Sequence, residues 1–343
     1  MNIRTPLRPF VAVSCVISAA LVLSACGGGS SESSAPASAA TQKSEYVTPR
    51  TMPEGKGSNA ADGDFPRTVV HFQGKSTLEA EPEKIVVIST GQADALLTLG
   101  VVPVGSTAGD GADMIPAYLT EAFPDDADDL AAVTSVGDRF APDLESVANL
   151  KPDLILMNTA GKDAAAMYKS LSEIAPTVAT QGTGLYWKQD FLLLGDAIGK
   201  REQAEKWLDD YQTEAADFGK GLPDPGNVSF LRQNEDRTRV FGVASFSGSV
   251  AEDIGLPRPE SQSFTDETSQ DISSEQLDLA DGDHLFYGVQ GGDATKLTGL
   301  PLWDSLAVVQ AGKAVAVDDD TFYLNTGPTA ARGILSTLEK TLG

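Results

Sequence analysis

The chain has 343 residues, of which 25 are lysine or arginine and 49 are aspartate or glutamate, giving a formal net charge of −24. Such an acidic surface repels nucleic acid and anionic lipid headgroups, so we expect neither as a direct binding partner. Two cysteines and two histidines are too few for a disulfide framework or a histidine-rich metal site.

The first 25 residues are typical of a bacterial export signal. Arg4 and Arg8 give the segment a positive start, and residues 11–23 form an almost unbroken apolar run. At about 13 residues the run is shorter than the ~20 that a transmembrane helix needs. We therefore predict a signal peptide over residues 1–25.

Cys26 follows the sequence Leu-Ser-Ala and precedes three glycines. This pattern resembles a bacterial lipobox, which implies cleavage before Cys26, lipid on its sulfur and new amino group, and a place on the outer face of the cytoplasmic membrane. Cys15 would leave with the signal, so the mature chain could form no intramolecular disulfide. Residues 26–64 are rich in Gly, Ser, Ala and Pro and are predicted to be the lipid anchor and a flexible tether.

The folded part is predicted to begin near Phe65. Short apolar, β-branched runs alternate with segments of helical periodicity, which is typical of βαβ units and a mainly parallel sheet. We assign residues 65–183 to this first α/β lobe. In chain order we predict strands at 68–72, 85–88, 101–104, 154–157 and 177–179, a turn at 74–76, and helices at 92–99, 144–150 and 164–174.

The periodicity then changes to one long helical stretch. Apolar residues recur at helical spacing through residues 188–218, so we assign 184–222 to an inter-lobe helix with a bend or a break at Gly199. Residues 223–343 are predicted to form a second α/β lobe. Its expected strands lie at 228–232, 240–243, 284–287 and 314–317, and its helices at 249–254, 274–279 and 329–342.

One pattern occurs in both lobes. Glu145 lies at a predicted helix start eight positions before Asp153, and Glu275 lies at another, eight positions before Asp283. A carboxylate in the first helical turn interacts favourably with the helix dipole, which is worth ~0.3–1 kcal/mol. Ser273 with a glutamine three residues later also fits a capping box. By local chemistry alone, both glutamates are explained as helix-start residues.

Several strings, taken in order and spacing, resemble the periplasmic binding proteins of ABC importers for ferric siderophores and cobalamin. They lie at residues 85–88, 96–105, 136–156, 174–177 and 303–306. The resemblance runs from about residue 66 to the end and implies two α/β lobes joined by a single long helix. It implies a monomeric binding protein, not an enzyme, that needs no cofactor and captures an iron(III)-siderophore complex for iron uptake. It also implies that Glu145 and Glu275 pair with arginines of the membrane permease.

The ligand is expected between the lobes, at loops that follow strand ends. Arg139 is the first candidate, because siderophore binders of this family often place an arginine in the matching loop and guanidinium donors suit chelating oxygens. Further candidates are Tyr186, Trp187, Arg232 and Tyr323, although the first two could equally pack in the core. Sequence alone leaves open which of Arg237, Arg239 and Arg258 face the cleft.

The sequence leaves open three alternatives to a siderophore-binding function. Cobalamin or haem could replace the siderophore as the ligand. A metal-ion binding protein would need several converging histidines and carboxylates, whereas His71 and His284 fall in predicted strands. An exported hydrolase could use Ser245, Ser247 or Ser249, but no G-x-S-x-G elbow surrounds them, and no Walker A motif is present.

Overall fold

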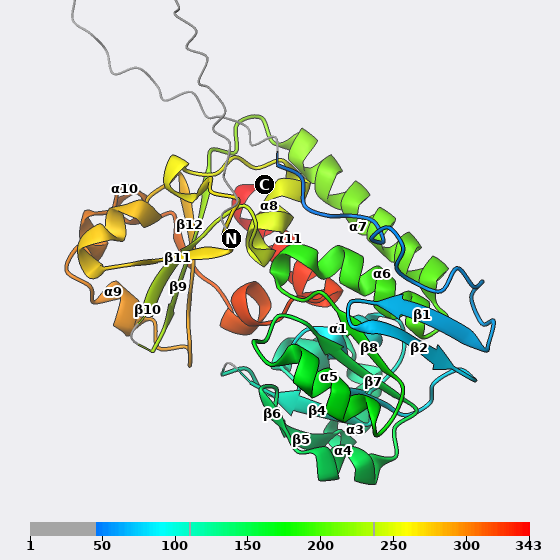
Figure 1. The fold of residues 1–343 in the computed structure, drawn as a ribbon. Coiled ribbons are helices and arrows are strands. Elements are labelled where there is room, and N and C mark those ends of the chain that lie inside the picture. Colours follow the sequence, from blue (N-terminus) through cyan, green and yellow to red (C-terminus); the bar gives the residue numbers. More distant parts are fainter. Residues whose placement is uncertain (1–45, 110, 236) are drawn as a thin grey trace, which may run out of the picture. The chain divides into compact units, whose positions relative to one another are not determined.

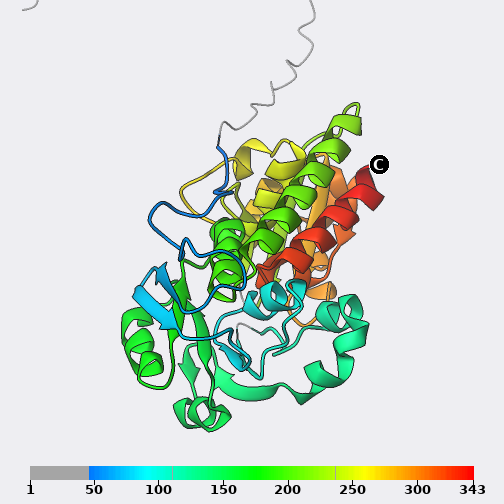
Figure 2. The same ribbon diagram turned by 90° about the vertical axis from the view of Figure 1, so that its right-hand side faces the viewer.

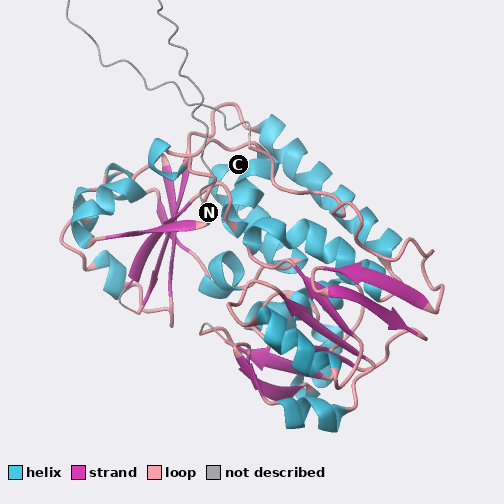
Figure 3. Cartoon of the chain, in the orientation of Figure 1, coloured by secondary structure: helices cyan, strands magenta, loops and turns pink. Residues whose placement is uncertain are grey.

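The computed structural model describes residues 46–109, 111–235 and 237–343 (Figure 1). The predicted signal peptide, Cys26 and the first part of the predicted tether lie outside the described residues. The strands gather in two separate sheets, one in each lobe, with a two-stranded hairpin beside the first (Figure 3). The predicted class of two α/β lobes is confirmed.

The first lobe is built on a six-stranded sheet in the order β6-β5-β4-β3-β7-β8. All its ladders are parallel except that between β5 and β6. The central strand β3 is buried along its whole length, as a parallel strand covered on both faces must be. The strands are β3 (Ile85–Val87), β4 (Gly105–Ala108), β5 (Thr134–Asp138), β6 (Ala141–Pro142), β7 (Leu154–Asn158) and β8 (Thr177–Thr180).

Helices of this lobe connect the strands, and a hairpin precedes them. The helices are α1 (Gln92–Thr98), α2 (Ala117–Ala122), α3 (Ala127–Ala132), α4 (Leu144–Leu150) and α5 (Ala164–Ser172). The hairpin consists of β1 (Arg67–His71) and β2 (Gly74–Leu78), so the turn predicted at 74–76 is wrong: these residues pair with β1. The strand predicted at 101–104 is also wrong, because the chain enters the sheet only at Gly105.

The second lobe has a five-stranded sheet in the order β11-β10-β9-β12-β13. β12 pairs in parallel with β9 and β13, whereas β10 pairs antiparallel with β9 and β11. This sheet is therefore mixed, and the prediction of mainly parallel pairing holds for the first lobe. The strands are β9 (Val228–Asn234), β10 (Arg237–Phe241), β11 (Ser269–Ile272), β12 (His284–Val289) and β13 (Ala314–Ala316); the helices are α8 (Phe246–Ile254), α9 (Thr295–Thr298) and α10 (Ala307–Gln310).

Two helices, not one, form the connection between the lobes. α6 (Trp187–Ala197) and α7 (Arg201–Gly221) are separated at Gly199, whose φ of 78° is readily adopted by glycine. α7 runs beside the C-terminal helix α11 (Pro328–Leu342), as Figure 2 shows. Their apolar faces belong to one hydrophobic cluster that also includes residues of α1 and α8, so the core is continuous across the lobe junction.

Residues 46–64 are not a free tether. Thr48 is buried and donates its hydroxyl to Glu252 of α8, and Arg50 forms ion pairs with Glu252 and Asp253. Further along the chain, the backbone N–H and the hydroxyl of Ser58 donate hydrogen bonds to the carboxylate of Asp196 in α6. The predicted boundary at 64 is therefore too late, because the chain is already part of the folded body at Thr48.

Asp94 of α1 fixes the first lobe to α11. Its carboxylate is 1% exposed and accepts hydrogen bonds from the backbone N–H of Thr329 at 2.8 Å and of Ala330 at 3.0 Å, and from the Tyr118 hydroxyl at 2.9 Å. It thereby caps a helix that begins in the other lobe. A Cβ at Gly327 would clash with this carboxyl group, so glycine is required there.

We predict that Asp94→Ala lowers the free energy of unfolding by about 2–4 kcal/mol, because two N–H groups and a hydroxyl would lose a buried acceptor. Urea denaturation followed by circular dichroism measures this. Asp143→Ala is the matched control, since Asp143 also caps a helix, α4, but at the exposed surface where water replaces it. Equal losses in the two variants would contradict a special role for Asp94.

Candidate functional site

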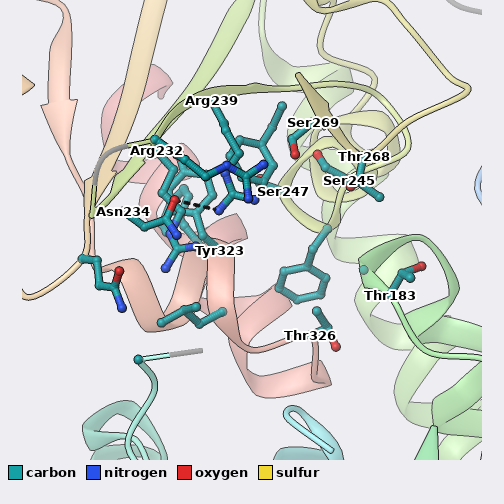
Figure 4. Close-up of a pocket in the computed structure, with 18 of the residues that line it drawn as sticks. Thr183, Arg232, Asn234, Arg239, Ser245, Ser247, Thr268, Ser269, Tyr323 and Thr326 are labelled. Atoms are coloured by element: carbon teal, nitrogen blue, oxygen red, sulfur yellow. Dashed lines mark hydrogen bonds between the residues drawn. The ribbon is translucent and has the colours of Figure 1, made fainter. Parts of the chain in front are cut away.

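A cavity of about 530 Å³ lies between the lobes (Figure 4). The first lobe contributes Gly111, and the segment before α6 contributes Thr183 and Gly184. Most of the lining comes from the second lobe, chiefly from β9, β10, the start of α8 and the short π-helix Asp320–Leu324 that precedes α11. The volume falls within the range of small-molecule sites.

Strand pairing places arginines together on the cavity wall. β9 and β10 are antiparallel, with Arg232 opposite Arg239 and Asn234 opposite Arg237. Because side chains alternate between the faces of a sheet, these four residues share one face, and Phe241 continues it. All five line the cavity. The sequence left open the placement of Arg237 and Arg239, and the signal that could have found them is this two-residue period.

The arginines are only partly neutralised. Arg232 is paired with Asp319, and the exposed Arg237 with Asp271. Arg239 donates to Asn234 at 3.2 Å, but its buried Nε has no hydrogen-bond partner among the described residues. Burial lowers the pKa of Arg239, and the nearby Arg232 and Arg237 lower it further.

Ser247 adds a second buried group of this kind to the cavity wall. Its Oγ also lacks a hydrogen-bond partner in the described part of the chain. Buried donors of native proteins are normally satisfied, so unpaired ones in a cavity suit a ligand that brings acceptors. The site can therefore hold anionic oxygens, which guanidinium groups bind in charge-assisted hydrogen bonds.

Aromatic rings form the apolar part of the lining. Phe241, Phe246, Phe322 and Tyr323 all border the cavity. Tyr323 packs against Phe241 with ring centroids 4.9 Å apart and donates its hydroxyl to the carbonyl of Phe286. Burial raises the pKa of Tyr323 well above its ordinary value. Its hydroxyl is thus occupied within the protein, and its ring is the part that faces a ligand.

Arg139 does not line the main cavity. Its Nη1 donates to the Thr90 hydroxyl at 3.1 Å, and its guanidinium lies 4.4 Å from the centre of the Phe140 ring. Thr90 borders a much smaller cavity of about 20 Å³, which shares Thr326 with the main one. Arg139 therefore contacts a residue that lines the small cavity and is itself absent from the lining of both cavities.

The remaining predicted ligand residues are placed differently. Arg232 and Tyr323 line the cavity. Trp187 is 2% exposed, donates its indole N–H to Ser249 and packs edge-on against Tyr211 and Phe246, so it lies in the core. Tyr186 ends the turn that contributes Gly184 and is not itself part of the lining.

Arg258, the third arginine left open by the sequence, is a structural residue. It donates to the carbonyls of Val228 and Phe241 and to the Gln262 side chain. Its guanidinium lies over the Phe230 ring, 4.5 Å from the ring centre. It is absent from the lining of the main cavity.

Glu145 and Glu275 are both exposed at helix starts. Glu145 is in the first turn of α4, which Asp143 caps. Glu275 is in the first turn of the 3₁₀ helix Ser274–Ala280, where a helix was predicted; the predicted capping box between Ser273 and Gln276 is present. Both side chains are available to a partner protein.

Two of the residues raised for other functions, Ser245 and His71, have structural partners. Ser245 caps α8 by accepting the N–H of Gly248. His71 is buried beside Ser76, and burial, with the nearby Lys56 charge, lowers its pKa to about 4. Over residues 46–109, 111–235 and 237–343, no group of three or more His, Cys, Asp or Glu could hold a metal ion, and no helix could span a membrane.

Comparison with known proteins settles the family. The profile described as "Periplasmic binding protein" matches residues 85–321. The chain belongs to this family. Among curated relatives of this periplasmic binding protein is a probable siderophore-binding lipoprotein of Bacillus subtilis, YfiY, 32% identical over 80% of this chain and 86% of that protein. Another is the Fe(3+) dicitrate-binding periplasmic protein FecB of Escherichia coli, 28% identical over 79% and 88%.

A solved structure agrees with the family assignment. Staphylococcus aureus SirA, crystallised with staphyloferrin B, superposes on the periplasmic binding protein with a TM-score of 0.69 and 26% identity. The match covers 80% of this chain and 98% of SirA. The two-lobed architecture described above is thus the architecture of a known ligand-binding protein.

Asp190 of α6 holds a loop at the cavity, and its carboxyl group makes the free energy of unfolding depend on pH. It accepts the N–H groups of Gln181 and Gly182, next to the lining residue Thr183. Burial raises the pKa of Asp190 from 3.8 to about 7, although these hydrogen bonds oppose the shift. Between those values the folded chain holds a proton that the unfolded chain has lost, so the free energy of unfolding falls as pH rises from about 4 to about 7.

We therefore predict a higher Tm near pH 5.5 than near pH 8, with a smaller difference in Asp190→Asn, which cannot titrate. Thermal denaturation followed by circular dichroism at the two pH values checks this. The same difference in wild type and variant would show that other groups carry the pH dependence.

Proposed function

We propose that this periplasmic binding protein captures a ferric siderophore in the cavity between its lobes and delivers it to an ABC permease for iron uptake. The observation that carries the proposal is the alignment of Arg232, Arg237 and Arg239 on one face of β9 and β10. In a chain of net charge −24, three arginines in one cavity mark a site for a negatively charged ligand.

The chemistry of the lining favours an oxygen-rich, anionic iron chelate. Ferric siderophores present carboxylate, catecholate or hydroxamate oxygens around the iron, and guanidinium groups bind such oxygens without touching the metal. The relatives described above are named for siderophore and ferric citrate binding, which supports the same ligand class. Cobalamin and haem are not favoured by these relatives, and neither is an exported hydrolase.

Delivery would use one glutamate on each lobe. Glu145 and Glu275 are exposed and would form ion pairs with arginines of the permease. Exposed ion pairs contribute only ~0–1 kcal/mol each, which suits a contact that must form and break in each transport cycle. Lipid on Cys26 would keep the protein on the outer face of the cytoplasmic membrane, close to the permease.

We predict that Arg239→Gln weakens binding of an anionic ferric chelate by about tenfold or more, since a charge-assisted hydrogen bond contributes ~1.5–3 kcal/mol. Titrations with ferric citrate, a ferric hydroxamate, a ferric catecholate, cobalamin and haem, followed by tryptophan fluorescence, measure both affinity and class. Arg201→Gln is the matched control, because Arg201 pairs with Glu205 on the surface of α7, outside the cavity. Saturable binding of cobalamin alone would overturn the proposal.

A second prediction concerns docking. The double variant Glu145→Ala, Glu275→Ala should lose uptake of radioactive iron in cells while its affinity for the ferric chelate stays unchanged, because neither residue lines the cavity. Glu121→Ala with Glu260→Ala, which removes one exposed carboxylate from each lobe elsewhere, is the control. Normal uptake by the first double variant would rule out this docking contact.

A further inference from the structure

We infer that Asp319 sets the ligand charge that the cavity accepts, by neutralising one of its three arginines from within the protein. The inference rests on the proposed function, since it concerns the same cavity. It makes Asp319 a specificity-determining residue, although Asp319 does not itself line the main cavity.

The contact between Asp319 and Arg232 is a two-point ion pair. Nε of Arg232 donates to Oδ1 at 2.7 Å and Nη2 donates to Oδ2 at 2.8 Å. The Arg232 side chain is 4% exposed and that of Asp319 is 12% exposed, so water screens the pair only weakly. Asp319 engages one edge of the guanidinium and leaves Nη1 for other partners.

The fold makes room for this carboxylate. Gly288 of β12 lies opposite Arg232 in the parallel ladder with β9. A Cβ at position 288 would lie 3.0 Å from Oδ1 of Asp319 and 2.7 Å from the Tyr323 ring, closer than side chains tolerate. A glycine at this register position therefore lets the ion pair and the cavity-lining tyrosine sit side by side.

Asp319 differs from the other carboxylates nearby. Asp318, Asp320 and Asp113 line a neighbouring cavity of about 380 Å³ together with Asp319. Burial and the charges of Asp318, Asp319 and Asp113 raise the pKa of Asp320 to about 6. Of these four, Asp319 is the one that forms an ion pair with an arginine of the main cavity among the described residues.

The ion pair between Asp319 and Arg232 therefore changes the relative affinities of ligands that differ in charge. With Asp319 ionised, Arg232 offers donors but little net charge, and an anionic chelate gains less than it would from an unpaired Arg232. Without that carboxylate, a highly anionic chelate would bind more tightly and a cationic one more weakly. Specificity is the difference between these two affinities.

The test compares Asp319→Asn with Asp113→Asn, using two iron complexes that differ in charge. Ferric citrate is anionic, and the ferrioxamine B complex carries a protonated amine. We expect Asp319→Asn to raise the ratio of ferric citrate to ferrioxamine B affinity about tenfold or more. Asp113→Asn removes the same charge from the neighbouring cavity without breaking an arginine contact and should change the ratio by about threefold or less.

A double-mutant cycle guards against a general disturbance of the fold. Arg232→Gln leaves the pair with a net negative charge, and the further change Asp319→Asn brings the pair back to the neutral charge that it has in wild type, so the double variant should have an affinity ratio close to that of wild type. Equal shifts for Asp319→Asn and Asp113→Asn, or a double variant whose ratio is raised as much as that of Asp319→Asn alone, would overturn the inference while leaving the proposed function intact. A wild-type protein that binds neither iron complex would overturn both.

Discussion

The geometry of the cleft depends on the hydrogen bonds that the buried carboxylate of Asp94 accepts from the start of α11. This carboxylate caps α11 from the opposite lobe. That helix is preceded by the short π-helix Asp320–Leu324, which supplies Tyr323 to the cavity, and by Thr326. A shift of the α11 start would therefore move the cavity wall. Gly327 is part of the same constraint, since a side chain there would displace the carboxyl group. The lobes are thus held by polar contacts as well as by the apolar core that runs through α1, α8 and α11.

The arginines at the cavity have the opposite sign of charge to the net charge of the protein. The chain is strongly acidic, yet one face of β9 and β10 collects three arginines at a cavity. Antiparallel pairing accounts for this, because a strand residue and its cross-strand partner point to the same side. Burying Arg239 near two other cations is unfavourable, and an anionic ligand would relieve it.

The sequence predicted the parts of this architecture that follow from local pattern. β3, β7 and β8 were found because buried parallel strands are short apolar runs, and the break between α6 and α7 because Gly199 interrupts a helical period. The strand register in the second lobe was not predicted, because the strands expected at 228–232 and 240–243 left out Asn234 and Arg237, which pair across a tight hairpin. That register decides that Arg239 faces the cavity, whereas Arg258 lies outside the strands and is buried by its hydrogen bonds to Val228, Phe241 and Gln262. For Trp187 the sequence left ligand contact and core packing open and placed the residue before the helix, whereas Trp187 is the first residue of α6 and packs against Tyr211.

These constraints bear on how a bound ligand could leave. Most of the cavity lining belongs to the second lobe, so a small separation of the lobes would leave the ligand in contact with the arginines. A wide separation is opposed by the shared core, by Asp94 and by the segment from Thr48 to Ser58, which bonds α8 at one end and α6 at the other. Release therefore depends on how strongly the arginines hold the ligand as well as on how far the lobes open. The carboxylate of Asp319 already occupies one edge of the Arg232 guanidinium, so an anionic chelate would be held less strongly there and would transfer more readily to a permease.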